Sequence, residues 1–149
     1  MSPPQILIAS AALAQRLKRE PQSVYNLAPR QFELLIAELL EDLGYRVEIT
    51  PATRDGGKDL LAYLEPELGT LLCLVEAKRY GREHKVGVDI VRSLYGTVSD
   101  AQANQGMLIT TSTFTQDARE FQRRHRYVLA LKDYADLERW IRSYGKRTS

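Results

Sequence analysis

The chain has 149 residues, a length typical of one domain with a sizeable hydrophobic core. Hydrophobic residues make up 44% of it and charged residues 27%, and no apolar run is long enough to cross a membrane. The net charge of +2 is too small to indicate a nucleic-acid partner by itself, and the single cysteine, Cys73, excludes both an internal disulfide and a cysteine-based zinc cluster. We therefore expect a cytoplasmic protein.

The first third of the chain predicts two helices. Residues 6–19 are expected to form a helix, which is followed by a loop that ends near Pro29. In residues 30–43 the apolar positions recur at helical spacing, and Gly44 is suited to end that helix. We predict three parts: an N-terminal helix and loop (residues 1–28), the main domain (29–145) and a basic tail (146–149).

Five strands and three further helices are predicted after residue 44. The strands are expected at 45–51, 59–65, 71–80, 106–112 and 127–133, and the helices after the loop 81–87, at 113–125 and at 134–145. The strand at 71–80 is the most apolar and is therefore expected at the centre. Short turns between the first three strands predict an antiparallel meander, whereas the later strands, separated by helices, predict parallel crossovers. The fold class is α/β, with a mixed five-stranded sheet flanked by helices on both faces.

The central strand ends in two opposite charges, Glu76 and Lys78. Residues i and i+2 of a strand point to the same face, so these side chains should stand side by side and either form a salt bridge or share a ligand. Asp59 opens the preceding strand, after the turn residues 53–58. If these two strands pair as a hairpin, Asp59 lies across from the Glu76–Lys78 end.

Two carboxylates and a lysine at one sheet edge are suited to a divalent metal ion. Mg²⁺ takes oxygen ligands from one or two carboxylates, lowers the pKa of a bound water and neutralises charge on a phosphate. A lysine nearby can stabilise the transition state or orient the attacking water. Glu33 lies at the margin of the apolar stripe of the 30–43 helix. It either joins this site or is a helix-start carboxylate favoured by the helix dipole.

The arrangement Asp59 … Glu76-Ala77-Lys78 resembles the PD-(D/E)xK nuclease signature. An ordered series of segments, from FELLIAELLEDLGYRVEITPATRDGGKDLLA through VEAKRY and GMLITTSTFTQDAREF to LALKDYADLERW, resembles the catalytic domain of Mrr-like restriction endonucleases over about residues 27–140. The resemblance implies a restriction-endonuclease-like fold and cleavage of DNA with Mg²⁺, for which Mn²⁺ is expected to substitute. It also implies that Asp59, Glu76 and the Ala77 carbonyl bind metal, that Lys78 is the catalytic lysine and that Glu33 is the helix acid.

This sequence departs from the family pattern at two positions. Many Mrr-like members have Gln where this chain has Glu76, so the chain carries the more general nuclease form, which favours activity. Lys58 stands where the signature has Pro.

Several basic residues are candidates for contacts with DNA. Arg79, His84 and Lys85 follow the site, and the segment from Arg119 to Ser149 holds nine Arg and Lys against four acidic residues, with Arg123 and Arg124 adjacent. Each of these groups either binds phosphates or forms a solvated surface. Thr110, Thr111 and Ser112 end the fourth predicted strand, where helix capping is favoured over contact with phosphate.

We expect DNA as the partner, a homodimer for double-strand cutting, a separate target-recognition domain or subunit, and no membrane association. The alternatives are a repair or junction-resolving nuclease of the same fold and a catalytically silent DNA-binding module.

Overall fold

The computed structural model describes residues 3–50 and 60–146, with side chains from Ser10 onward. In chain order the elements are α1 (Pro3–Arg19), η1 (Pro21–Asn26), α2 (Pro29–Asp42), β1 (Arg46–Ile49), β2 (Leu60–Leu64), β3 (Leu71–Lys78), α3 (Val88–Asp100), β4 (Gln105–Thr110), α4 (Gln116–Arg124), β5 (Leu129–Lys132) and α5 (Tyr134–Arg142). Every predicted helix and strand is present, with ends that differ by a few residues. The short 3-10 helix η1 was expected as part of a loop.

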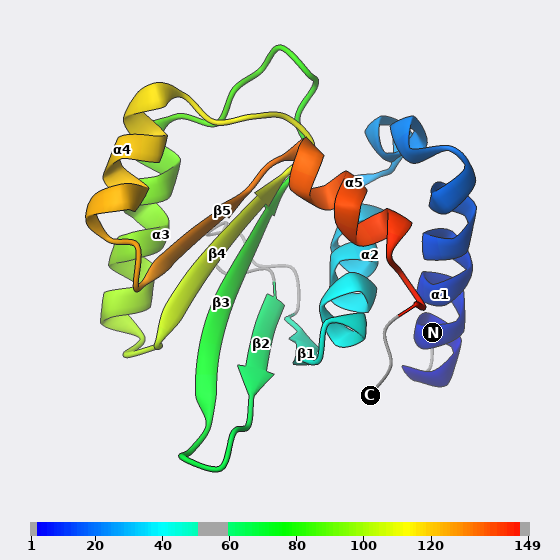
Figure 1. Cartoon of the computed structure of the whole chain (residues 1–149), viewed down its shortest axis with the longest axis horizontal. Coiled ribbons are helices and arrows are strands. Elements are labelled where there is room, and N and C mark those ends of the chain that lie inside the picture. Colours follow the sequence, from blue (N-terminus) through cyan, green and yellow to red (C-terminus); the bar gives the residue numbers. More distant parts are fainter. Residues whose placement is uncertain (1–2, 51–59, 147–149) are drawn as a thin grey trace.

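The sheet has five strands in the order β1-β2-β3-β4-β5, with β3 at the centre (Figure 1). β1, β2 and β3 pair antiparallel, while β4 pairs parallel with both β3 and β5. The predicted meander and the predicted parallel crossovers are therefore confirmed. Because both β4 and β5 follow a crossover helix, β3, β4 and β5 all end at the same edge of the sheet.

Two hydrophobic cores cover the two faces of the sheet. The alternating side chains Cys73 and Val75 of β3 lie in a core with α1, α2 and α5, whereas Leu74 lies in a core with α3 and α4. Figure 1 shows α3 and α4 on one side of the sheet and α1, α2 and α5 on the other. A strand covered on both faces is expected to be apolar throughout, which accounts for the composition of β3.

The helix ends follow their sequence signals. Gly44 has a φ of +108° directly after α2, a conformation that glycine adopts without the steric penalty of a side chain. Thr115 begins α4 by accepting a hydrogen bond from the Ala118 N–H, and Asp133 begins α5 by accepting one from the Asp136 N–H. Each such cap contributes about 1 kcal/mol of stability. Within the described residues, no helix has both the length and the apolar character needed to span a bilayer.

Candidate active site at the edge of the sheet

The ends of several strands meet at one edge of the sheet. Ile49 at the end of β1 pairs with Leu60 at the start of β2, and Leu60 pairs with Val75 of β3. On the other side of β3, Lys78 pairs with Thr110 at the end of β4. The segments that carry the predicted site residues Glu76 and Lys78 therefore end at this edge.

Glu76 and Lys78 lie side by side at this edge, as the spacing predicted. The Lys78 Nζ atom is 3.1 Å from Glu76 Oε2, and the side chains are 29% and 11% exposed respectively. Their place in the alternation of β3 puts them on the face covered by α3 and α4, because Leu74 belongs to that core. A carboxylate with so little exposure needs a cationic partner, and the Lys78 ammonium is one.

The salt bridge and the shared ligand were the two alternatives for this pair. The structure shows the ion pair, which is compatible with both, since a carboxylate has two oxygens and can meet a lysine and a metal ion together. Ala77 between them is half-buried and packs against the core on the α2 side.

Asp59 lies outside the described residues. It immediately precedes Leu60, whose β3 partner is Val75, the residue before Glu76. Among the residues that the structure does describe, no group of three or more His, Cys, Asp or Glu side chains could hold a metal ion. The proposed ligand set of Asp59, Glu76 and the Ala77 carbonyl thus remains a prediction.

Glu33 lies in the first turns of α2 and is tied to the end of β1 through Arg30. The Arg30 Nη1 atom is 2.7 Å from Glu33 Oε1 and 3.4 Å from the carbonyl oxygen of Thr50, the residue after β1. The Glu33 side chain is 19% exposed, so it does not extend into bulk water. Its membership in the metal site remains a prediction, because its recorded partner is Arg30.

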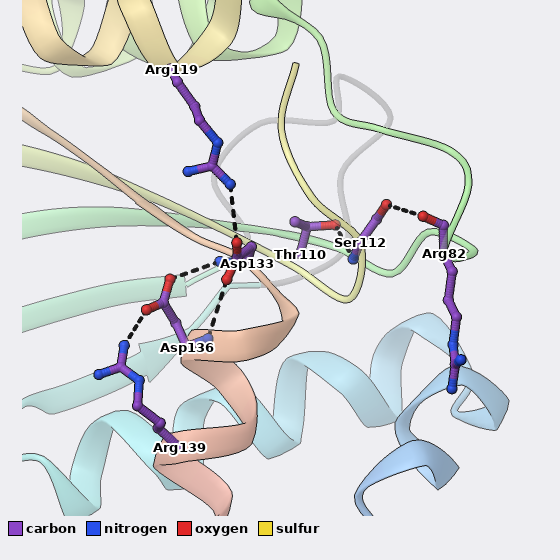
Figure 2. Close-up of polar contacts among 7 residues, drawn as sticks. All are labelled: Arg82, Thr110, Ser112, Arg119, Asp133, Asp136 and Arg139. Atoms are coloured by element: carbon purple, nitrogen blue, oxygen red, sulfur yellow. Dashed lines mark hydrogen bonds and ion pairs between the residues drawn. The ribbon is translucent and has the colours of Figure 1, made fainter. Parts of the chain in front are cut away.

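The loop after Lys78 is fastened to the end of β4 by three successive residues. The Thr111 N–H donates to the Lys78 carbonyl at 3.3 Å, and the Thr111 hydroxyl donates to the Tyr80 carbonyl at 2.5 Å. The Ser112 hydroxyl donates to the Arg82 carbonyl at 3.0 Å, and the Ser112 N–H donates to the Thr110 hydroxyl at 3.0 Å (Figure 2). We call this set the β4 clasp.

The β4 clasp corrects the expectation of helix capping for Thr110, Thr111 and Ser112. All three are buried, and Thr115 is the residue that caps α4. Sequence reasoning missed the role of these hydroxyls because their partners are backbone carbonyls about 30 residues away, which no spacing rule relates to them.

The three residues after Lys78 that were predicted to contact DNA, Arg79, His84 and Lys85, differ in how accessible they are. The Arg79 guanidinium donates to the Tyr25 carbonyl of η1 at 3.3 Å, while its buried Nε atom has no hydrogen-bond partner in the described part of the chain. The His84 ring stacks on Tyr80 with 4.1 Å between centroids, and Lys85 is exposed. His84 and Lys85 are therefore accessible, whereas Arg79 is directed toward η1.

Arg123 and Arg124 are both exposed near the end of α4, but they face different neighbours. Arg123 lines a groove beside β5, whereas the Arg124 guanidinium lies 5.6 Å from the centre of the Phe121 ring. The two adjacent arginines thus belong to different surfaces.

A chain of charges joins α4 to the start of α5 (Figure 2). The Arg119 guanidinium is 3.0 Å from the Asp133 carboxylate. At the start of α5, the Asp133 N–H donates to the Asp136 carboxylate and the Asp136 N–H donates to the Asp133 carboxylate. Asp136 in turn forms an ion pair with Arg139. Burial acts to raise the pKa of Asp133, but the Asp136 N–H and the Arg119 guanidinium outweigh it and hold that pKa below its ordinary value. Asp is a residue type favoured at the start of a helix, whereas the pairing of Asp133 with Arg119 joins two elements and has no local sequence signal.

Comparison with known proteins agrees with this geometry. Residues 24–141 match the family model Mrr_cat, described as restriction endonuclease. The chain is 32% identical over 105 residues to the type IV methyl-directed restriction enzyme EcoKMrr of Escherichia coli (strain K12), covering 67% of this chain and 34% of that protein. It is 31% identical over 111 residues to the uncharacterized protein y4cE of Sinorhizobium fredii (strain NBRC 101917 / NGR234), covering 74% of this chain and 28% of that one. The chain thus spans about a third of the length of these curated relatives.

Two solved structures share the fold. The DNA modification-dependent restriction endonuclease AspBHI aligns with a TM-score of 0.63 and 24% identity over 96% of this chain and 36% of its own. The MspJI restriction endonuclease, solved in complex with a 27-mer oligonucleotide, aligns with a TM-score of 0.64 and 22% identity over 90% of this chain and 31% of its own. Together with the family model, which matches well over half of the chain, these findings show that the chain belongs to the restriction endonuclease family.

Proposed function

We propose that this domain hydrolyses phosphodiester bonds of DNA with Mg²⁺, and that Mn²⁺ substitutes for it. The observation that carries the proposal is the Glu76–Lys78 pair, held 3.1 Å apart at the end of the central strand of a restriction-endonuclease fold. The proposal extends beyond the family assignment, because this chain spans only part of each relative's length.

The metal ligands in this proposal are the Asp59 and Glu76 carboxylates and the Ala77 carbonyl. Oxygen ligands of this kind suit Mg²⁺, which would lower the pKa of a bound water and offset charge on the phosphate. The register supports the set, because Asp59 directly precedes Leu60, and the β3 partner of Leu60 is followed by Glu76.

Lys78 is proposed to orient the attacking water and to stabilise negative charge on the phosphate. Its ammonium reaches Glu76 already, so a group bound at Glu76 would meet both side chains at once. Glu33 is proposed to support the site from the start of α2, at the end of the hydrogen-bonded link through Arg30 to Thr50.

Contacts with the DNA backbone are proposed for the loop after Lys78, at Arg79, His84 and Lys85, and for the arginines of α4. The proposal that DNA is the partner is supported by two similar proteins: EcoKMrr is a methyl-directed restriction enzyme, and MspJI was solved in complex with an oligonucleotide. Because the chain covers about a third of each, we propose that target recognition belongs to a separate domain or subunit. We also propose a homodimer for double-strand cutting, since two strands of opposite polarity require two sites.

The test is cleavage of plasmid DNA by the full chain with Mg²⁺, with Mn²⁺ or with EDTA. Glu76→Ala and Lys78→Ala should each lower the rate by about 10²–10⁴-fold, the range typical of removing one group that acts in the chemical step. Glu48→Ala and Lys146→Ala are the matched controls, because both side chains are exposed and lie outside the site. Asp59→Ala tests the remaining ligand in the same assay.

A second readout separates metal binding from turnover. Mg²⁺ should raise the melting temperature of the wild type and of Lys78→Ala but not that of Glu76→Ala, since only the last lacks a proposed ligand. Equal cleavage by the wild type and both site variants would refute the assignment. Absence of cleavage of linear, methylated and branched DNA, together with tight binding, would favour a catalytically silent DNA-binding module, and preference for branched or damaged DNA would favour a repair or junction-resolving nuclease.

A further inference from the structure

A groove of about 490 Å³ runs between α4 and the free edge of β5. It is lined by Arg119, Gln122 and Arg123 of α4, by Arg126 of the turn that follows, and by residues 129–132 of β5. Arg119, Gln122 and Arg123 lie on one face of α4, at the spacing i, i+3, i+4, and Arg126 follows in the turn between α4 and β5. We call this feature the β5 groove; Figure 1 shows α4 and β5 on that side of the sheet.

The β5 groove is strongly cationic. Four of its lining residues are basic, and the structure pairs one of them, Arg119, with the carboxylate of Asp133 at 3.0 Å. For Arg123, Arg126 and Lys132, no acidic partner within 4.0 Å is recorded in the part of the chain that the structure describes. Such a groove is suited to a ligand that carries several negative charges in a row.

One of these cations is held by an exposed aromatic ring. The Arg126 guanidinium lies 4.8 Å from the centre of the Tyr127 ring, and its Nη1 atom donates to the Arg123 carbonyl at 3.4 Å. Tyr127 is itself 79% exposed, so the pair stands at the solvent boundary of the groove. The ring limits the rotamers of Arg126 and thereby lowers the entropy cost of presenting its charge.

The backbone of β5 argues against a peptide strand as the occupant. The Val128 carbonyl accepts from Gly106 of β4, so the alternation of a parallel ladder directs the backbone groups of Leu129 and Leu131 toward the free edge. The Leu129 N–H already donates to the His125 carbonyl, and the Leu129 carbonyl accepts from Gln122 Nε2 at 2.9 Å. Strand addition needs a row of free backbone groups, and here only Leu131 offers them.

The groove lies level with the candidate active site. Lys132 pairs with Ile109, which pairs with Ala77 between Glu76 and Lys78. Two strand spacings, about 10 Å, therefore separate the end of the groove from the central strand. That distance corresponds to about three nucleotides along one strand of B-form DNA.

We propose that the β5 groove binds consecutive backbone phosphates of the DNA segment that flanks the cleavage position, through Arg123, Arg126 and Lys132. The inference rests on the proposed function, because it takes DNA as the ligand. It adds a defined surface to that function. The adjacent Arg124 lies near Phe121 and does not line this groove. Phosphate contacts of this kind position the nucleic acid without reading its sequence.

The test measures binding apart from cleavage. Fluorescence anisotropy with a labelled 20-base-pair duplex is recorded in EDTA over a range of KCl concentrations, and again with Mg²⁺ on the Lys78→Ala background so that no DNA is cut. The groove variant is Arg123→Gln with Arg126→Gln. The control variant is Arg16→Gln with Arg19→Gln, which removes the same charge from two exposed arginines of α1.

The groove variant should bind on the order of tenfold more weakly at 50 mM salt, with a log–log salt slope shallower by about 1.8, because each phosphate contact contributes about 0.9 to that slope. The control variant should keep the wild-type slope. Circular dichroism spectra of both variants check that they are folded.

Three outcomes would overturn the inference: equal loss in the two variants, no loss in either, or no binding by the wild type under both conditions. Binding that depends on the groove in a protein that cuts no DNA would sustain the inference and refute the proposed function. If Lys78→Ala abolishes cleavage but both double variants bind DNA equally well, the proposed function is sustained and the inference about the groove is refuted.

Discussion

Lys78 is held through both its backbone and its side chain. Its carbonyl accepts from the Thr111 and Tyr80 N–H groups, and its ammonium pairs with Glu76. The spacing of Glu76 and Lys78 predicted correctly that they share a face, because the two-residue period of a strand is a local property. Their distance from Thr111 and Ser112 could not be predicted, because it depends on how β3 and β4 are paired.

Cys73 gives a prediction for pH dependence. Burial raises the pKa of this thiol to about 12, from an ordinary value of 9.0. The folded state therefore keeps the thiol proton between about pH 9 and 12 whereas the unfolded state loses it, so this group stabilises the fold fully below pH 9 and progressively less above it.

The measurement is urea unfolding of the wild type and of Cys73→Ala at pH 7, 9 and 11. The wild type's advantage in free energy of unfolding should be constant up to about pH 9 and shrink by pH 11. The comparison with Cys73→Ala is needed because the pKa of Tyr144 is also raised, by burial first and then by its hydrogen bond to Glu38. An advantage that does not change with pH would contradict the assignment to the thiol.

At the scale of elements, the junction of α3 with β4 depends on a residue without a side chain. A Cβ atom built on Gly106 would lie 2.7 Å from Val98 Cγ2, closer than Cβ atoms approach other atoms in folded proteins, and 3.1 Å from Leu94 Cγ, which is a tight contact. Gly106 therefore lets the helix approach the strand closely.

We expect Gly106→Ala to destabilise the domain by about 1–3 kcal/mol, the usual cost of overpacking a core. In a Val98→Ala background the same substitution should cost less, since the clashing methyl group has been removed. A double-mutant cycle of urea midpoints measures the difference. Additive effects of the two substitutions would show that the Val98 contact is not the cause.

The sequence predicted which segments form helices and which form strands, but it did not predict the residues at which they begin and end. Apolar periodicity located all five strands and five α-helices, because each pattern is contained in its own segment. The 3-10 helix η1 carries no such periodicity, since six residues are too few to show a repeat. The predicted helix 113–125 begins later, at Gln116, because Phe114 forms a bridge with Val86 before the Thr115 cap.

At the scale of the whole molecule, α1 is part of the core on the α2 side. Ala14 and Leu17 are fully buried together with residues of α2 and α5, and the Lys18 ammonium donates to the Tyr144 carbonyl at 2.7 Å. The Tyr144 hydroxyl in turn donates to Glu38 of α2. The predicted division at residue 28 thus falls within one continuous core, although residues 1–28 remain a candidate for a separate part in function.

Because of this shared core, Leu17→Ala should destabilise the entire domain by about 2–5 kcal/mol. Unfolding followed by Trp140 fluorescence and by far-ultraviolet circular dichroism should give coincident transitions for the wild type and the variant, as expected of one cooperative unit. Arg16→Ala is the control, since an exposed site in the same helix should change stability by no more than about 0.5 kcal/mol. Separate transitions for the two probes would indicate that α1 and its core fold independently of the sheet.

The hydrogen bond from Gln122 to the Leu129 carbonyl also bears on behaviour at high concentration. A free sheet edge is a common route to aggregation, because two copies can join their strands into a larger sheet. Here the side chain of Gln122 and the backbone of His125 occupy both outward groups of Leu129, and the cations of the β5 groove repel an identical edge. At high concentration, the β5 edge is therefore a poor site for two copies to join their sheets.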